Sequence, residues 1–193
     1  MTGATLGGVH DNFMVGTSNS SPGSAEPYIA IWVDWNCAGG QTAVVVQGTS
    51  LVVDANDGGV FIYEISGLLA TSAVLDQNTN QINNPNGTSW SSGATGTTTN
   101  ANEIWIGVGS CYNTLTTRPG SPWTSIPGTS NVATAGYQIV STTGTATYAG
   151  TQNSSGPNTW AAGVITLQAP AGPAVTGEGI RVVQQAVPRA SLW

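Results

Sequence analysis

The sequence predicts an all-β protein built as an antiparallel two-sheet β-sandwich, of jelly-roll or immunoglobulin-like type, with an extended C-terminal arm. Short apolar runs rich in Val, Ile, Trp and Tyr recur along the chain, as is typical of strands. Gly, Pro, Asn and Ser separate these runs and supply the turns. No stretch shows the apolar spacing of an amphipathic helix, so sheets packed on sheets are the expected architecture.

The chain has 193 residues, enough for one domain with a sizeable core and two extensions. Residues 1–27 are Gly- and Ser-rich and are expected to form an N-terminal extension or edge strand, with a short strand at 13–15. Residues 28–169 form the sandwich domain. Residues 170–193 begin with a Pro-Ala-Gly-Pro segment typical of a linker and end in the arm.

Residues 28–35 form the most aromatic predicted strand. Its alternate residues Ile29, Ile31, Val33 and Trp35 are expected to face the core. A Val-rich strand follows at 42–47.

Residues 51–67 predict a β-hairpin, because two apolar runs flank an Asp-Gly pair that tolerates positive φ. Residues 68–76 have room for a single helical turn. Residues 77–100 are almost wholly Asn, Thr, Ser and Gly, and they form either a long surface excursion or weakly patterned edge strands.

The strand at 103–108 returns to clear alternation, with Ile104, Ile106 and Val108 on one face and Trp105 on the other. Three further strands are expected at 135–141, 145–148 and 160–168.

Charge excludes several classes of partner. The net charge is -6, and the only basic side chains are Arg118, Arg181 and Arg189, so binding to nucleic acid or to an anionic membrane surface is not expected. Charged residues make up 6% of the chain, far below the usual share. A neutral surface rich in hydroxyl and amide groups is typical of proteins that work outside cells or on particle surfaces.

The first residues show neither the basic nor the apolar region of a signal peptide, and no apolar run is long enough to span a bilayer. Two origins fit this pattern: a fragment whose signal was removed, or a virion component made in a host cytoplasm.

Cys37 and Cys111 each follow a predicted strand, and each could lie at the same end of the sandwich. They form either a disulfide or two free, semi-buried thiols, depending on the redox compartment.

No motif indicates catalysis, a cofactor or a metal. His10 is the only histidine, which makes a zinc site improbable, and a Gly-x-Ser-x-Gly motif is absent. Asp54, Asn56 and Asp57 resemble half of a calcium loop but lack its closing Glu, and Asx residues in a turn need no metal. Glu64 and Glu103 are expected on solvent-facing strand positions, although as a pair they would be the acid and base of a glycosidase.

Three aromatic residues, Trp90, Tyr112 and Trp123, fall in loop-like segments and are candidates for contact with a glycan or a partner. Packing is the alternative for all three. Trp32, Trp35, Trp105 and Trp160 are better explained as core or sheet-face residues.

Residues beyond the linker have strand propensity and carry two of the three arginines. They are either a disordered end or an arm that pairs with the sheet edge of a neighbouring subunit. The candidate arm residues are Ile180, Arg181, Val182, Val183, Arg189 and Trp193.

The strand sequences resemble a known series. The stretches at 61–67, 75–76, 101–107, 137–144 and 160–165 are similar to the strands of a β-sandwich module that recurs in secreted bacterial repeat proteins and in tail or fibre proteins of bacteriophages and prophages. The resemblance covers residues 28–168. It implies a display or adhesion unit without a shared active site, so it assigns no catalytic residue.

These observations predict a non-enzymatic structural protein of a phage virion, a minor tail, fibre or decoration component that acts in assembly or surface adhesion. Its expected partners are other virion proteins, further copies of itself in a homo-oligomer, and a host-surface glycan. The alternative is a carbohydrate-binding or adhesion module of a secreted bacterial protein, located outside the cell or on its surface.

Overall fold

The computed structural model describes the backbone of residues 5–7, 13–19, 27, 29–36, 45–47, 62–82, 87–126, 131–153, 160–171 and 181–185. Side chains are described in the same ranges except in 5–7, 13–19, 45–47, 62 and 181–185.

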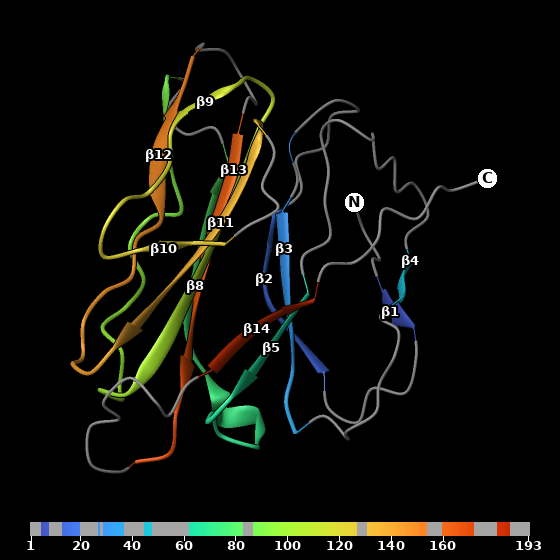
Figure 1. Ribbon diagram of the computed structural model, residues 1–193, viewed down its shortest axis with the longest axis vertical. Helices are drawn as coiled ribbons and strands as arrows, with labels where there is room; N and C mark the ends of the chain where they lie inside the picture. Colours follow the sequence, from blue (N-terminus) through green and yellow to red (C-terminus); the bar gives the residue numbers. More distant parts are fainter. Residues whose placement is uncertain are drawn as a thin grey trace.

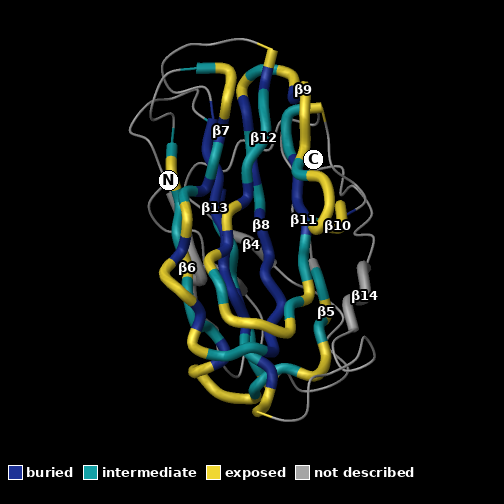
Figure 2. Tube along the Cα trace, turned by 90° about the vertical axis from the view of Figure 1, so that its left-hand side faces the viewer, coloured by how far each residue is buried: buried dark blue, intermediate teal, exposed yellow. Residues whose placement is uncertain are grey.

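Two antiparallel sheets form the centre of the molecule, which confirms the all-β prediction. The larger has five strands in the order β10-β11-β8-β13-β6, and the smaller has three in the order β7-β12-β9. The two sheets lie face to face (Figures 1 and 2). Their strands are β6 (Leu75–Ile82), β7 (Ser89–Ser91), β8 (Glu103–Cys111), β9 (Leu115–Thr117), β10 (Thr124–Ser125), β11 (Ala133–Val140), β12 (Ala149–Gln152) and β13 (Trp160–Gln168).

Three strand pairs complete the described chain, together with η1, a single 3-10 turn at Ser72–Val74 that confirms the predicted helical turn. The pairs are β1 (Thr5–Gly7) with β4 (Val45–Gln47), β2 (Phe13–Asn19) with β3 (Ile29–Asp34), and β5 (Ile62–Ser66) with β14 (Arg181–Gln185).

Strands β8 and β13 are buried on both faces, because the five-stranded sheet is a middle layer. On one face Ile104, Ile106 and Ile165 pack with Val33 of β3 and with Val74 of η1. Ile31 and Trp35, which belong to the predicted core set, also pack on this face, as does Ile65 of β5. The opposite face carries Trp105, as predicted, and meets the three-stranded sheet. A continuous apolar sequence such as Trp-Ala-Ala-Gly-Val-Ile in β13 suits a strand covered on both sides.

Two large rings fill the space between the sheets by resting on glycines. Trp90 of β7 and Tyr148 are both 1% exposed, and their ring centroids are 5.7 Å apart. A Cβ atom at Gly109 would lie 2.8 Å from Cζ3 of Trp90, and one at Gly107 would collide with the Tyr148 ring. Gly150 of β12 leaves room for Trp90 from the other side, since a Cβ there would lie 2.5 Å from Cζ2 of that ring. The rings therefore pack on bare backbone.

The chain between β7 and β8 is hydrogen-bonded to residues 144–148 through backbone groups and side-chain hydroxyls, an arrangement called here the hydroxyl ladder. The backbone N–H groups of Ser92, Thr95 and Thr98 donate to the carbonyl oxygens of Tyr148, Ala146 and Gly144, at 2.9, 3.0 and 2.8 Å. The same three side-chain hydroxyls accept the N–H groups of Tyr148, Ala146 and Gly144, at 3.0, 2.9 and 3.1 Å. Each Ser or Thr thus donates and accepts as a strand residue would, with its hydroxyl replacing a carbonyl.

Successive bonded residues of the ladder are three positions apart in residues 92–98 and two positions apart in residues 144–148. The intervening residues of the Ser/Thr side include Gly93, which has φ +75, and Gly96. Side chains of β6 lie beside both glycines: a Cβ at Gly93 would lie 2.9 Å from Nε2 of Gln81, and one at Gly96 would lie 2.7 Å from Oε1 of Gln77.

The ladder explains where the predicted elements differ from the observed ones. Residues 77–100 contain an edge strand, β6, and the short β7, which agrees with the second alternative for this stretch. The strand expected at 145–148 is wrong, since β12 begins at Ala149 and the preceding residues pair with hydroxyl groups. Of the predicted hairpin 51–67, residues 51–61 lie outside the described chain, and β5 pairs with β14.

The packing of the Tyr148 ring on Gly107 predicts that Gly107→Ala greatly lowers the stability of the protein. The added methyl group must displace the buried Tyr148 ring, and overpacking of this kind costs about 1–3 kcal/mol. Urea unfolding should show the loss. Gly120→Ala is the matched control, because a Cβ at this exposed glycine meets no atom within 4 Å; equal midpoints for the two variants would contradict the role given to Gly107.

The ladder predicts that Thr95→Val destabilises the protein more than Thr95→Ser. Val fills nearly the same volume but leaves the buried N–H of Ala146 without its acceptor, which costs about 1–3 kcal/mol. Ser keeps the hydroxyl and loses only a methyl group. Chemical unfolding of both variants decides the point, and a Val variant as stable as the Ser variant would show that the hydroxyl bond contributes nothing.

Candidate functional site

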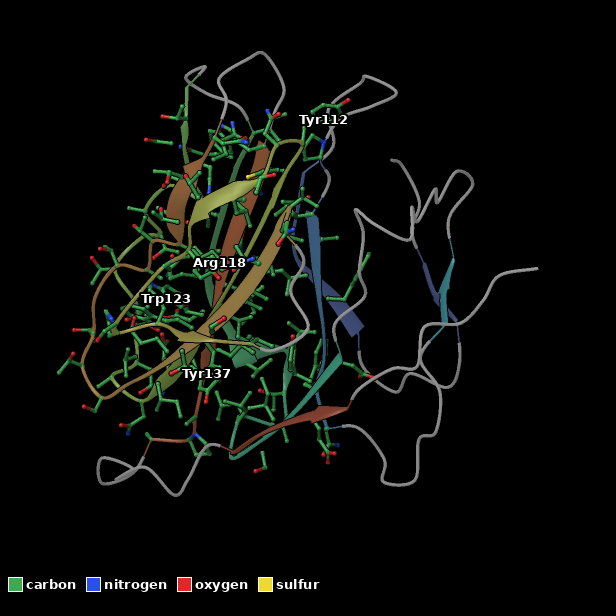
Figure 3. The ribbon with its side chains drawn as sticks, turned by 45° about the horizontal axis from the view of Figure 1, so that its top comes forward. Tyr112, Arg118, Trp123 and Tyr137 are labelled. Carbon is green, nitrogen blue, oxygen red and sulfur yellow. The ribbon has the colours of Figure 1, made fainter. Side chains whose placement is uncertain are left out.

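The three candidate aromatic residues do not converge on one surface. Trp90 lies in the core, so its ring offers no face to a surface ligand. Trp123 is half-buried and packs edge-on against Tyr148, with ring centroids 4.9 Å apart. Tyr112 is 66% exposed in the turn between β8 and β9. Figure 3 shows Tyr112 at one end of the sandwich, well apart from Trp123, whereas Arg118 lies nearer to Trp123.

The outer face of the three-stranded sheet carries a row of hydroxyl groups. Register places Ser89 of β7 opposite Thr151 of β12, and Thr151 opposite Thr117 of β9. Oγ1 of Thr151 lies 2.7 Å from Oγ1 of Thr117 and 2.7 Å from Oγ1 of Thr116. Because Trp90 points to the core from the middle of β7, its neighbours in that strand face outward. The hydroxyl row itself is uncharged and rich in donors and acceptors.

Glu103 lies where the sequence did not predict it. It was expected to face solvent, but its exposed fraction is 0%. It shares the inner face of β8 with Trp105, whose Nε1–H donates to Oε2 of Glu103 at 2.9 Å. Burial raises the pKa of Glu103 to about 7, although the bond from Trp105 acts in the opposite direction.

Glu64 does not approach Glu103. It is exposed on β5, a strand whose Ile65 packs on the opposite face of the five-stranded sheet. The middle layer therefore separates the two carboxyl groups, and they do not form the acid and base of a glycosidase.

Asp76 of β6 is the acidic side chain that interacts with Glu103. The register of β6 shifts here, since Gln77 pairs with Thr166 and Leu75 with Leu167, which makes Asp76 an extra, bulged residue. Its Oδ2 accepts the backbone N–H of Thr99 at 2.6 Å, and its Oδ1 accepts the Thr99 hydroxyl at 2.8 Å. Burial tends to raise the pKa of Asp76, but hydrogen bonds, the two from Thr99 first among them and those of Glu103 and Gln77 after, together outweigh it and lower the pKa.

Two further buried groups have raised pKa values. Cys111 is a free, buried thiol, and burial raises its pKa to about 12, so it stays protonated. Burial also raises the pKa of Tyr148 to about 12, against the bond with Thr134 and the charge of Arg118. Neither group is placed to act as a nucleophile at neutral pH.

Several predicted residues lie outside the described chain. They are His10, Cys37, Asp54, Asn56, Asp57, Ile180, Arg189 and Trp193. Of the predicted arm, the backbone of Arg181, Val182 and Val183 belongs to β14, which pairs antiparallel with β5 of the same chain.

Within the described ranges, no three His, Cys, Asp or Glu side chains gather in a group that could hold a metal ion. The described part also contains no helix with the length and hydropathy of a membrane span.

Sequence reasoning missed the Glu103–Asp76 pair and the hydroxyl ladder. The ladder had a signal, because Ser92, Thr95 and Thr98 recur every third residue and Gly follows the first two. The carboxyl pair had none, since the bulge that turns Asp76 toward Glu103 depends on pairing with a strand almost ninety residues away.

The chain matches no protein-family model, no curated protein sequence and no solved structure.

Proposed function

We propose that this chain is a non-enzymatic structural protein of a phage virion, a minor tail, fibre or decoration component that works in assembly or surface adhesion. In this proposal the sheets form a jelly-roll or immunoglobulin-like sandwich, and the C-terminal segment serves as an arm in assembly. Partners are other virion proteins or further copies of the chain. The protein acts through its surfaces and needs no cofactor.

The strand arrangement is the observation that carries this proposal. Four of the five stretches that resemble phage and secreted display modules fall in β11, β8, β13 and β6, which are adjacent strands of one sheet. The fifth falls in β5. The resemblance therefore lies mostly in the five-stranded sheet, as expected if this sheet is the frame that presents a surface.

The chemistry of the outer surface supports the same proposal. The hydroxyl row of Ser89, Thr117 and Thr151 is uncharged and runs across all three strands of the smaller sheet. Such a face can contact another protein or a glycan through many weak hydrogen bonds without the cost of desolvating charges.

The composition of purified particles tests the proposal. Mass spectrometry of gradient-purified phage from the cells that encode this chain should detect its peptides in the same fractions as the major capsid protein. Immunogold labelling of the particles gives its position. The proposal fails if the chain is abundant in the lysate but absent from the particles.

A carbohydrate-binding module of a secreted bacterial protein is the second candidate, favoured by the exposed Tyr112 and by the hydroxyl row of the three-stranded sheet. Aromatic rings stack on sugar rings, and hydroxyl groups bond to their substituents. A glycan array should then give binding that Tyr112→Ala or Trp123→Ala abolishes.

Two controls make the array informative. Ile139→Ala removes another exposed apolar side chain, 40% exposed on β11, and should leave binding unchanged. Unfolding curves must accompany Trp123→Ala, because this residue also packs against Tyr148. Binding that is absent in the wild type, or lost equally in the Ile139 variant, would exclude the carbohydrate site.

A further inference from the structure

One oxygen of the buried Glu103 has no hydrogen-bond donor. Oε2 accepts from Trp105, but Oε1 is buried and no group donates to it in hydrogen-bonding geometry. A buried carboxylate in this state would be costly, because an unsatisfied charged oxygen loses its hydration without replacement.

The carboxyl group of Asp76 supplies a partner only when a proton is present. The side chains of Glu103 and Asp76 lie close enough to interact, and each changes the pKa of the other in the direction expected of a hydrogen bond from Glu103 to Asp76. Two ionised carboxylates have no hydrogen between them and repel, so this bond requires a proton on one of them.

Of the two carboxyl groups, Glu103 is the one that carries the proton. Asp76 already accepts the backbone N–H and the hydroxyl of Thr99, which stabilise its ionised form. Glu103 is fully buried and its pKa is raised, first by burial and then by Asp76. Glu103 therefore donates its proton to the Asp76 carboxylate.

No other charge controls this pair within the described chain. From β13, the groups nearest in register to Glu103 are Gln168 and Thr166, and the uncharged hydroxyl of Thr166 lowers the pKa of Glu103, as the bond from Trp105 does, without outweighing burial. From β11, the residue opposite Glu103 is Val140. Among the described residues, Asp76 is the only charged group that acts on Glu103.

We propose that the Glu103–Asp76 pair is a proton-operated latch that fastens edge strand β6 and the end of the hydroxyl ladder to central strand β8. In the closed state the shared proton joins the two carboxyl groups, and Asp76 holds Thr99. When Glu103 loses its proton, two neighbouring carboxylates repel, and separation of Asp76 lets water reach the buried one. The bond from Thr99 to Asp76 then opens with it.

The direction of the pH dependence follows from the two groups. The folded state holds the Glu103 proton up to about pH 7, whereas the unfolded chain loses it near the ordinary value for Glu. The latch is therefore closed at mildly acidic pH, and its stabilisation is lost as the pH rises through 7. Asp76, with its lowered pKa, loses its own stabilising effect only when the pH falls below the ordinary range for Asp.

Amide hydrogen exchange of the full chain at pH 5.5 and pH 8, corrected for the intrinsic exchange rate, is the direct test. Protection of the Thr99 amide should fall about tenfold to a hundredfold at pH 8, and Gln77, whose N–H donates to Thr166, should follow. Amides in the middle of β8 and β13 should change far less. In parallel, the unfolding equilibrium constant should rise on the order of a hundredfold between pH 4.5 and pH 8.

The variant that decides is Glu103→Gln, because a Gln amide donates permanently to Asp76 and has no proton to lose. It should remove most of the pH dependence at Thr99. Glu64→Gln changes an exposed carboxylate on β5 and should behave as the wild type. His10→Gln removes the only histidine, the other side chain that ordinarily titrates in this range.

Asp76→Asn keeps the test valid if Glu103→Gln fails to fold. An amide at position 76 donates to the Glu103 carboxylate, so the transition should move to lower pH. The proposal is overturned if Thr99 protection does not depend on pH in the wild type. It is also overturned if the dependence persists in Glu103→Gln, or is lost in His10→Gln.

Discussion

The spacing of the two larger sheets depends on two aromatic rings that rest on backbone with no side chain between. Facing sheets normally lie about 10 Å apart, with side chains from both sides sharing the gap. The Trp90 and Tyr148 rings instead span the gap by themselves, because β8 has Gly107 and Gly109, which carry no side chain, beneath them. The remaining inner residues, such as Ala162 and Val164, are small enough to fill the space that is left. The core is thus specified by an alternation of very large and absent side chains.

The hydroxyl ladder holds the segment that carries Tyr148 in place. Tyr148 can lie across β8 only if the segment before β12 is held in place, and residues 92–98 hold it without forming a regular strand. Ser and Thr hydroxyls satisfy the buried N–H groups of Ala146 and Tyr148, which would otherwise be unpaired. A chain poor in charge but rich in Ser and Thr can therefore bury polar backbone through its side chains.

Periodicity predicted most of the buried frame, since the alternation in 29–35 and 103–108 gives the faces of β3 and β8 correctly. It failed where a strand residue takes its partner from a hydroxyl group, as at 145–148. It failed again at Glu103, because a carboxylate between apolar residues has the pattern of a solvent-facing position. Only the pairing of β13 with both β6 and β8, and the bulge at Asp76, place a second carboxyl group beside it. Such long-range contacts leave no local signal.

The carboxyl pair and the ladder form one continuous structure. Thr98 makes the last ladder bond, to Gly144, and the next residue, Thr99, binds Asp76. At the other end, Ser92 pairs with Tyr148, whose buried ring packs on Gly107. The segment is therefore fixed by aromatic packing at one end and by a hydrogen-bonded carboxyl pair at the other. Since packing does not respond to pH and a shared proton does, the proposed latch places the start of opening at Thr99 and leaves the rings packed.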